Sequence, residues 1–208
     1  MKKIIIFDLD GVLIDSISNM NYAWKKSCEE SNIKKPFKFY KKYIGLPFYE
    51  ILRKLKIDKK YHFNLERRYN FHSLTKIKLI KLSSYNATIL KKLKKKYILA
   101  LFTSKNKKRA EEVLGSYKNL FKYKVYPSKK FLGKPHPDGL NKIIKFSKLK
   151  KKDAVYLGDT IYDYQCSKDA KIDYIHANWG YQNIKNKRLI RINKLNEIND
   201  YLEKINCD

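Results

Sequence analysis

Short apolar runs that end abruptly in polar residues recur along the chain. Runs of β-branched and aliphatic residues bounded in this way are typical of buried strands. We predict five strands, at residues 2–7, 97–102, 124–126, 154–157 and 172–176. Three of them, at residues 2–7, 97–102 and 154–157, are followed directly by clusters of acids or hydroxyls.

Helical patterns fill the intervals between these runs. Apolar residues spaced three and four apart predict helices at residues 86–95, 105–114, 138–146, 161–170 and 195–205, and Asp138 is the expected N-cap of the third. Strands that alternate with helices predict an α/β fold, a doubly wound parallel sheet with helices on both faces. Ligands of such sheets bind beyond the carboxyl ends of the strands.

The segment from residue 16 to residue 82 interrupts this alternation. It lacks a run with the composition of a buried strand, and it shows helical patterns at residues 18–31, 37–43, 48–55 and 63–73. We therefore predict a helical domain of residues 16–82 inserted into a core formed by residues 1–15 and 83–208.

The net charge of +28 is the most unusual bulk property of the sequence. It is compatible with a nucleic-acid or other polyanionic partner. However, 42 of the 48 basic residues are Lys, spread over the whole chain, and Ile outnumbers Ala by 23 to 7, a skew that AT-rich codons produce. Proteins that read nucleic-acid bases rely heavily on Arg. We therefore interpret the charge mainly as codon bias, and a polyanion-binding protein or a nucleic-acid end phosphatase remains a less favoured alternative.

The cysteines and the longest apolar runs indicate the cellular compartment in which we expect the protein. Cys28, Cys166 and Cys207 are far apart and form no Cys-x-x-Cys pair, which argues against a disulfide framework or a zinc site. No run approaches the roughly 18 apolar residues that a membrane span requires. The N-terminal apolar run stops at Asp8 without a cleavage site. We expect a cytoplasmic protein without a membrane partner, either a monomer or a homodimer.

Polar side chains gather where the predicted strands end. Asp8 and Asp10 follow the first strand, and Asp159 and Asp163 follow the strand at residues 154–157. Carboxylates brought close together are costly unless a cation separates them or one is protonated. Oxygen ligands of this kind favour Mg²⁺. The sequence therefore predicts a magnesium site at this edge of the sheet.

Three other residues at this edge suit a phosphate group. Thr103 and Ser104 follow the strand at residues 97–102, and the helix after them offers backbone N–H groups to an anion. Lys134 lies in a two-proline turn before the next helix. A carboxylate that attacks a phosphate faces a repulsion of about 4 kcal/mol per charge pair at 4 Å. A metal ion and a lysine can overcome it.

In their order and spacing these residues resemble the four motifs of the haloacid dehalogenase superfamily. The matching positions are Asp8-Leu9-Asp10-Gly11, Thr103, Lys134, and Gly158-Asp159 with Asp163. The helical segment resembles the C1-type cap of that superfamily. The phosphoglycolate phosphatase-like branch is suggested by residues 10–16, 44–47, 133–138 and 179–181.

The resemblance implies a phosphatase with a small-molecule phosphate ester as its substrate. Asp8 would attack phosphorus and form an aspartyl-phosphate, and Asp10 would protonate the leaving oxygen and then activate water. Thr103 and the backbone of Ser104 would hold the phosphate, and Lys134 would stabilise it together with Asp8.

The resemblance also implies a cofactor. Mg²⁺ would be held by Asp8, the backbone carbonyl of Asp10, and Asp159, with Asp163 bound to it directly or through water. Asp10 argues against the dehalogenases that give the superfamily its name, since these lack the second acid and need no metal.

Some questions stay open at this stage. A phosphomutase of the same branch remains the nearest alternative, and the sequence does not tell which phosphate ester is the substrate. Within the predicted cap, Gly45, Leu46 and Arg53 are candidates for contacts with the leaving group.

Overall fold

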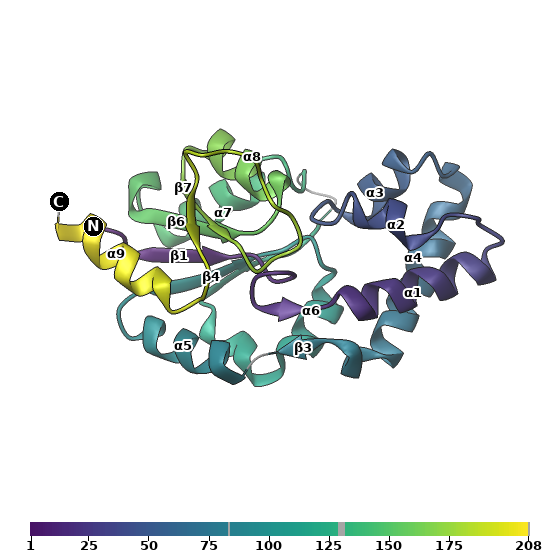
Figure 1. Ribbon diagram of the computed structural model, residues 1–208, viewed down its shortest axis with the longest axis horizontal. Coiled ribbons are helices and arrows are strands. Elements are labelled where there is room, and N and C mark those ends of the chain that lie inside the picture. The colour runs from purple at the N-terminus through teal and green to yellow at the C-terminus, as the bar shows by residue number, and fades with distance from the viewer. Residues whose placement is uncertain (83, 129–131, 208) are drawn as a thin grey trace.

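A six-stranded parallel sheet forms the centre of the protein. The computed structural model describes residues 1–82, 84–128 and 132–207. The strand order is β5-β4-β1-β6-β7-β8 (Figure 1). The strands are β1 (Ile4–Phe7), β4 (Ile98–Phe102), β5 (Tyr123–Val125), β6 (Ala154–Gly158), β7 (Asp173–Ala177) and β8 (Ile190–Ile192). The predicted α/β class and parallel sheet are confirmed.

Strand β1 lies in the middle of the sheet because all of its side chains are apolar. It pairs in parallel with β4 on one side and with β6 on the other. Ile5 and Phe7 join the hydrophobic cluster on one face, and Ile4 and Ile6 join the cluster on the opposite face. This alternation is the two-residue period expected of a strand buried on both faces.

Helices cover both faces of the sheet. Helices α5 (Ser84–Lys94), α6 (Lys107–Leu114) and α9 (Glu197–Cys207) pack on one face, and α7 (Asp138–Ser147) and α8 (Ile161–Ala170) pack on the other. Short 3-10 helices at Gly115–Leu120 and Lys151–Asp153 lie in the connections. The prediction that Asp138 caps α7 is wrong. Pro137 occupies the cap position, and the Asp138 carboxylate accepts the N–H of Leu132 instead.

Residues 16–82, which we call the insertion, form a helical body beside the sheet (Figure 1). Its helices are α1 (Ile17–Glu30), α2 (Phe37–Lys41), α3 (Phe48–Lys54) and α4 (His62–Thr75), with 3-10 turns at Lys59–Tyr61 and Ile77–Leu79. It has a hydrophobic cluster of its own, in which Trp24, Leu65 and Tyr69 are almost fully buried. The insertion therefore holds its shape through its own packing.

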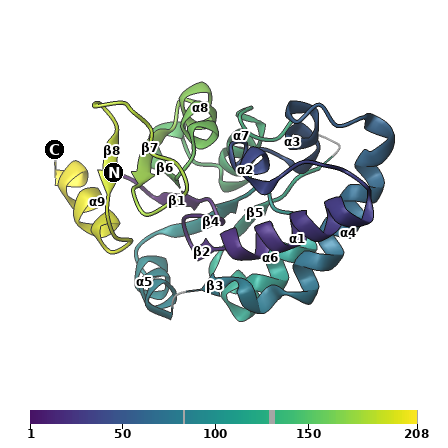
Figure 2. The ribbon, with the colours of Figure 1, turned by 45° about the vertical axis from the view of Figure 1, so that its right-hand side comes forward.

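A small antiparallel ribbon marks the two points where the chain passes between core and insertion (Figure 2). Strand β2 (Ile14–Asp15) pairs with β3 (Lys81–Leu82), so that Ile14 lies opposite Leu82. The sequence pattern predicted neither of these two-residue strands, nor β8.

The insertion faces the edge of the sheet at which the strands have their carboxyl ends, and both chain termini lie toward the opposite end (Figure 1). None of the helices in the described ranges is long and apolar enough to span a lipid bilayer. The polar residues that follow β1, β4 and β6 are thus placed between the sheet and the insertion.

Candidate active site

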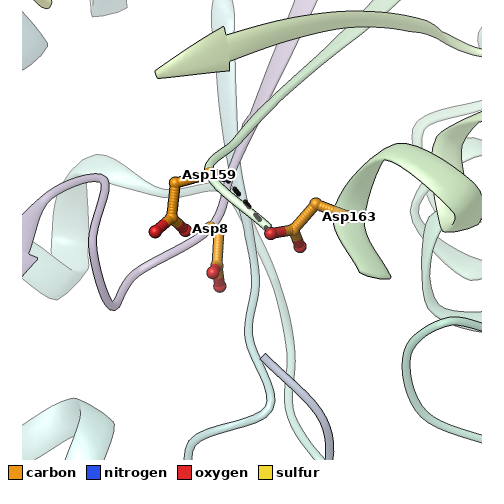
Figure 3. Close-up of side chains that lie close together, drawn as sticks. All are labelled: Asp8, Asp159 and Asp163. Carbon is orange, nitrogen blue, oxygen red and sulfur yellow. Dashed lines mark hydrogen bonds between the residues drawn. The ribbon is translucent and has the colours of Figure 1, made fainter. Parts of the chain in front are cut away.

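Three buried carboxylates converge beyond the ends of β1 and β6 (Figure 3). Asp8 follows β1, Asp159 follows β6, and Asp163 lies in the first turn of α8. One oxygen atom of each lies within 4.8 Å of those of the other two. The three come together because β1 and β6 are parallel neighbours whose ends meet at the same edge.

The start of α8 holds Asp163 in place. Its Oδ2 accepts the N–H of Thr160 at 3.0 Å and the Thr160 hydroxyl at 2.6 Å. The Thr160 hydroxyl in turn accepts the N–H of Asp163, which completes a capping box. The other oxygen, Oδ1, accepts the Tyr156 hydroxyl at 2.6 Å. These bonds fix the carboxylate toward the strand ends.

Lys134 is the cation of this cluster. Its Nζ lies 2.8 Å from Asp8 Oδ1 and 2.7 Å from Asp163 Oδ1. It is almost completely buried, with the rings of Phe102 and Tyr156 within 6 Å. One buried ammonium group thus pairs with two of the three carboxylates.

The pKa values show that this cluster is short of positive charge. Burial raises the pKa of Asp8 to about 7, although Lys134 opposes the shift. Burial and the neighbouring carboxylates raise the pKa of Asp159 well above its usual range. Burial also acts to raise the pKa of Asp163, but its bonds to Lys134, Thr160 and Tyr156 hold it below the usual range.

The surroundings of Asp159 fit a metal ion. Its Oδ2 accepts the N–H of Tyr181 at 2.6 Å, whereas its buried Oδ1 has no hydrogen-bond partner among the described residues. The backbones of Gly11 and Gly180 lie so close that a Cβ atom on either would clash with this carboxylate. Hard oxygen donors with an excess of negative charge suit Mg²⁺. Asp8, Asp159 and Asp163 therefore form a suitable donor set.

The Asp10 carboxyl group, which the sequence placed near the same metal, is not part of this cluster. Its Oδ1 lies 2.9 Å from the Nζ of Lys105 and also accepts the hydroxyl of Ser16. Ser16 begins the insertion, and its N–H is bound by the hydroxyl of Tyr181 at 2.7 Å. Asp10 therefore lies at the junction between the core and the insertion.

Thr103 and Ser104 follow β4, as the sequence predicted. Thr103 is buried, and its hydroxyl accepts the N–H of Lys105 at 3.1 Å. The Ser104 hydroxyl donates to the backbone oxygen of Gly45 in the insertion at 2.7 Å. The side chain of Ser104 thus joins the two bodies, and its backbone remains the candidate for a phosphate contact.

A cavity of about 50 Å³ lies between these strand ends and the insertion. Of the sequence-predicted residues, the core contributes four and the insertion two to its wall, namely Asp8, Asp10, Thr103 and Ser104, and Gly45 and Leu46. Arg53 lies elsewhere: it is exposed and pairs with Glu50. The structure thus brings Gly45 and Leu46, but not Arg53, to the predicted site.

Two cations on the cavity wall were not singled out by the sequence. Lys105 is 4% exposed, and burial lowers its pKa to about 8; repulsion from Arg109 adds to this, whereas attraction by Asp10 opposes it. Arg109 is 6% exposed and lies over the Tyr69 ring at 4.7 Å. The four-residue spacing of Lys105 and Arg109 after Thr103 was the available sequence signal. It is weak in a chain with this many lysines.

Comparisons with known proteins agree with this geometry. Residues 5–177 match the family model described as haloacid dehalogenase-like hydrolase. No curated protein matches the chain. Among solved structures, the chain is similar to a haloacid dehalogenase-like family hydrolase from Streptococcus pneumoniae, with a TM-score of 0.81, 21% identity, and coverage of 97% of this chain and 98% of the other.

Two further structures show the same likeness over nearly complete chains. A predicted phosphoglycolate phosphatase from Haemophilus somnus 129pt superimposes with a TM-score of 0.83 at 19% identity, covering 97% of this chain and 98% of the other. For a predicted phosphatase from Clostridium acetobutylicum the TM-score is 0.83 at 21% identity, covering 98% and 99%. At these identities the likeness establishes the fold.

Proposed function

The chain belongs to the haloacid dehalogenase-like hydrolase family, and on this basis we propose that it is a Mg²⁺-dependent phosphatase acting on a small phosphate monoester. The observation that carries the proposal is the convergence of Asp8, Asp159 and Asp163 around Lys134, with Asp10 on the wall of the adjoining cavity. This combination provides a nucleophile, an acid/base group and a charge-stabilising site within one enclosure.

In the first step, a carboxylate oxygen of Asp8 attacks phosphorus and the bond to the ester oxygen breaks. Lys134, 2.8 Å from Asp8 Oδ1, orients the nucleophile and stabilises negative charge on the phosphoryl oxygens. Asp10 donates its proton to the departing oxygen. The products are an alcohol and a phosphorylated Asp8.

In the second step, Asp10 accepts a proton from water, and the water oxygen attacks phosphorus. The bond between Asp8 and phosphorus breaks, which releases inorganic phosphate and restores both carboxyl groups. Asp10 can serve in both steps because Lys105 and Ser16 hold it at the cavity wall, apart from the carboxylate cluster. Thr103 and the Ser104 backbone bind the phosphoryl oxygens.

The carboxylates of Asp8, Asp159 and Asp163, with the backbone carbonyl of Asp10, are the groups that would hold Mg²⁺. When bound, the ion supplies positive charge that offsets the repulsion between Asp8 and the phosphate. This requirement agrees with the raised pKa values of Asp8 and Asp159.

We infer that the insertion acts as a cap over this site. The Gly45 carbonyl binds Ser104, and the Ile44 carbonyl accepts the Gln182 side chain at 3.3 Å. A Cβ atom on Gly45 would lie 2.7 Å from the Thr160 hydroxyl, so only glycine allows this close approach. The contacts would exclude bulk water during the reaction.

A direct test uses p-nitrophenyl phosphate with Mg²⁺. We expect phosphate release that EDTA abolishes, and Asp8→Asn should lose turnover while its far-UV circular dichroism stays unchanged. Asp169→Asn is the matched control because it removes the same charge from an exposed residue of α8. Undiminished turnover by Asp8→Asn would remove Asp8 from the mechanism.

The small size of the cavity favours a small molecule over a nucleic-acid end. We expect no shift of DNA or RNA in a gel at 150 mM salt, since binding through scattered lysines falls steeply with salt. A retained shift would support the polyanion alternative. Product analysis separates hydrolysis from a phosphomutase: free phosphate is expected, and a phosphorylated sugar in its place would indicate transfer.

A further inference from the structure

We propose that Tyr181 is a positioning residue that acts through Ser16 on Asp10, the acid/base group of the proposed mechanism. The inference rests on the proposed phosphatase function, because it concerns the step in which the ester oxygen departs. Neither Tyr181 nor Ser16 lines the cavity, so both lie behind Asp10 as seen from the substrate. Together they fix which oxygen of Asp10 carries the proton.

The hydroxyl of Ser16 is the first argument, because its bonds are unusual for its position. Ser16 is the N-cap residue of α1, where a serine side chain commonly accepts a backbone N–H of the first helical turn. Here the side chain makes no such bond. Ser16 is fully buried, and its hydroxyl donates to Asp10 Oδ1 instead. The hydroxyl is therefore committed to Asp10 rather than to the helix.

The hydroxyl of Tyr181 sets the direction of the hydrogen bonds around Ser16. Its oxygen accepts the N–H of Ser16 at 2.7 Å and lies 3.2 Å from Ser16 Oγ. Since the hydrogen of Ser16 Oγ is directed to Asp10, the phenol is the donor in the contact between the two hydroxyls. Burial, and after it the nearby Asp10, raises the pKa of this phenol, which therefore keeps its hydrogen. The result is a chain of donors from Tyr181 through Ser16 to Asp10.

This chain of donors distinguishes the two oxygens of the Asp10 carboxyl group. Ser16 Oγ donates to Oδ1, and Lys105 Nζ lies 2.9 Å from the same atom. An oxygen that accepts a hydrogen bond and faces an ammonium group has little tendency to bind a proton. The transferable proton therefore belongs on Oδ2. As the bond between phosphorus and the ester oxygen breaks, this proton passes to the ester oxygen, and Asp10 is left as a carboxylate.

The backbone of Tyr181 is fixed to the carboxylate cluster. Its N–H donates to Asp159 Oδ2 at 2.6 Å. Two residues earlier, Trp179 Nε1 donates to the carbonyl of Val12 at 3.0 Å, which ties the same loop to the segment after β1. Tyr181 thus reaches from a proposed metal ligand to the hydroxyl that holds Asp10. The placement of the acid/base group is thereby tied to the placement of the proposed metal site.

The test compares two esters of similar size that differ in their need for a proton. p-Nitrophenolate departs readily without one, whereas the alkoxide of benzyl phosphate must be protonated as it leaves. Each protein is assayed with Mg²⁺ on both esters, and kcat/KM for benzyl phosphate is divided by kcat/KM for p-nitrophenyl phosphate. A loss of folded or metal-loaded protein lowers both values equally and leaves this ratio unchanged.

Variants assign the ratio to the chain of donors. Tyr181→Phe removes only the phenol oxygen and should lower the ratio by roughly tenfold. Ser16→Ala removes the donor to Asp10 and should lower it by roughly 10- to 100-fold. The double variant should lose little more than Ser16→Ala, because Tyr181 acts through the Ser16 hydroxyl. An unchanged ratio in Tyr181→Phe, or losses that multiply in the double variant, would overturn the proposal.

The matched control is Tyr164→Phe. It also removes a phenol oxygen that accepts one hydrogen bond, from the Asn186 amide at 3.4 Å, and it should keep the wild-type ratio. A fall in the ratio of this control equal to that of Tyr181→Phe would show that the effect is not specific to Asp10, and the proposal would fail.

A second measurement does not depend on turnover. Tyr181→Phe removes the acceptor of the Ser16 N–H, so hydrogen exchange of this amide should become roughly tenfold faster. Mg²⁺ should raise the melting temperature as in the wild type, since the N–H that binds Asp159 belongs to the backbone. Unchanged exchange at Ser16 would show that the phenol does not hold this residue, which contradicts the proposal.

The outcomes separate this inference from the proposed function. If the wild type releases phosphate from neither ester, the phosphatase function fails and the inference fails with it. If the wild type hydrolyses only p-nitrophenyl phosphate, or if Tyr181→Phe keeps the wild-type ratio on both esters, the inference alone fails.

Discussion

The carboxylate cluster beyond β1 and β6 and the cavity wall beside the insertion differ in what holds their charged groups in place. In the carboxylate cluster, Asp8 and Asp159 follow neighbouring strands and Asp163 is bound by the first turn of α8. On the insertion side, Arg109 comes from the core helix α6 but is oriented by Ser73 and Asn70 of the insertion. The cluster is therefore built by elements of the core alone, whereas the orientation of Arg109 requires contact between core and insertion.

This difference predicts that the carboxylate cluster governs the reaction, and that the insertion side governs the choice of leaving group. The carboxylate cluster needs only elements of the core, namely the parallel sheet, α8 and the turn that carries Lys134, and should keep its geometry while the insertion changes. The position of Arg109 on the cavity wall depends on contacts between two bodies, so a shift of the insertion should alter the leaving group that fits. Substitutions in the two regions should therefore have distinguishable effects. Those in the carboxylate cluster should change kcat and metal binding, and those on the insertion side should change KM.

The largest effect is expected in the carboxylate cluster, from Lys134→Met. This change leaves Asp8 and Asp163 buried without their cation. We expect kcat to fall by roughly 10²–10³-fold and the free energy of unfolding to fall by roughly 3–5 kcal/mol. Urea unfolding and p-nitrophenyl phosphate turnover measure the two effects. Lys145→Met, an exposed residue of α7, is the control. A variant with wild-type stability would show that the carboxylates do not need this lysine.

A change behind the proposed metal site should have the next largest effect. A Cβ atom in Gly11→Ala would clash with the Asp159 carboxylate and displace it. We expect Mg²⁺ to bind about 10- to 100-fold more weakly, as when other supports of metal ligands are lost. The melting temperature is measured as Mg²⁺ is added, and the concentration that gives half of the maximal increase is compared between the variant and the wild type.

The control for this change is Gly115→Ala. Gly115 also has a positive φ, but a Cβ atom there would meet nothing within 4 Å. It reports the cost of backbone strain alone. If both variants bind Mg²⁺ equally well, contact with Asp159 is not what requires glycine at position 11.

On the insertion side, Ser73→Ala tests whether the insertion orients the guanidinium group. The change removes the oxygen that accepts Arg109 Nε and donates to the Asn19 side chain. We expect KM for p-nitrophenyl phosphate to rise about 5- to 10-fold at a stability cost of about 1 kcal/mol, with a smaller change in kcat. Thr75→Ala, on the same helix, should leave KM unchanged. A fall in kcat without a change in KM would assign Ser73 to the chemistry instead.

The smallest expected effect concerns pH and the metal. Because the pKa of Asp8 is raised to about 7, the folded metal-free protein binds this proton more tightly than the unfolded chain does. The contribution of Asp8 to stability is therefore largest at low pH and is lost as pH rises toward 7. In the proposed site Mg²⁺ would take the place of this proton, so it should raise Tm by a few degrees more at pH 8 than at pH 6.

Scanning calorimetry with EDTA or Mg²⁺ at the two pH values measures this difference. Asp8→Asn cannot ionise at this position and should show a smaller difference between pH 6 and pH 8. An equal Mg²⁺ effect at both pH values in the wild type would mean that Asp8 does not exchange a proton for the metal.

The carboxylate cluster was predictable because its signals are local. The chain has only 20 acidic residues, and acids placed directly after buried strands stand out among them. Since the ends of parallel strands share one edge, the topology alone was enough to place Asp8 and Asp159 together. The roles assigned to these residues came from the resemblance and remain proposals.

The insertion side was not predictable in the same way. Lys105 and Arg109 become a pair at the cavity only through burial and contact with the insertion, which no local pattern encodes. A similar limit applies to the fold. The edge strand β8 contains Arg191 and is only partly buried, so it lacks the continuous apolar run that identified β1 and β6. For Asp138 the sequence signal was present but misleading. Aspartate is a common N-cap residue, yet Pro137 occupies the N-cap position of α7.

The β2–β3 ribbon has a consequence for how such proteins diversify. Ile14 and Leu82 are paired neighbours, although 67 positions separate them in the sequence. The chain therefore departs from the core and rejoins it at one point on the surface. A segment of different length or origin can be exchanged at this point without a change in the strand order of the sheet. Grafting the corresponding segment of another family member between residues 15 and 81 would transplant a preference for one leaving group onto an unchanged catalytic core.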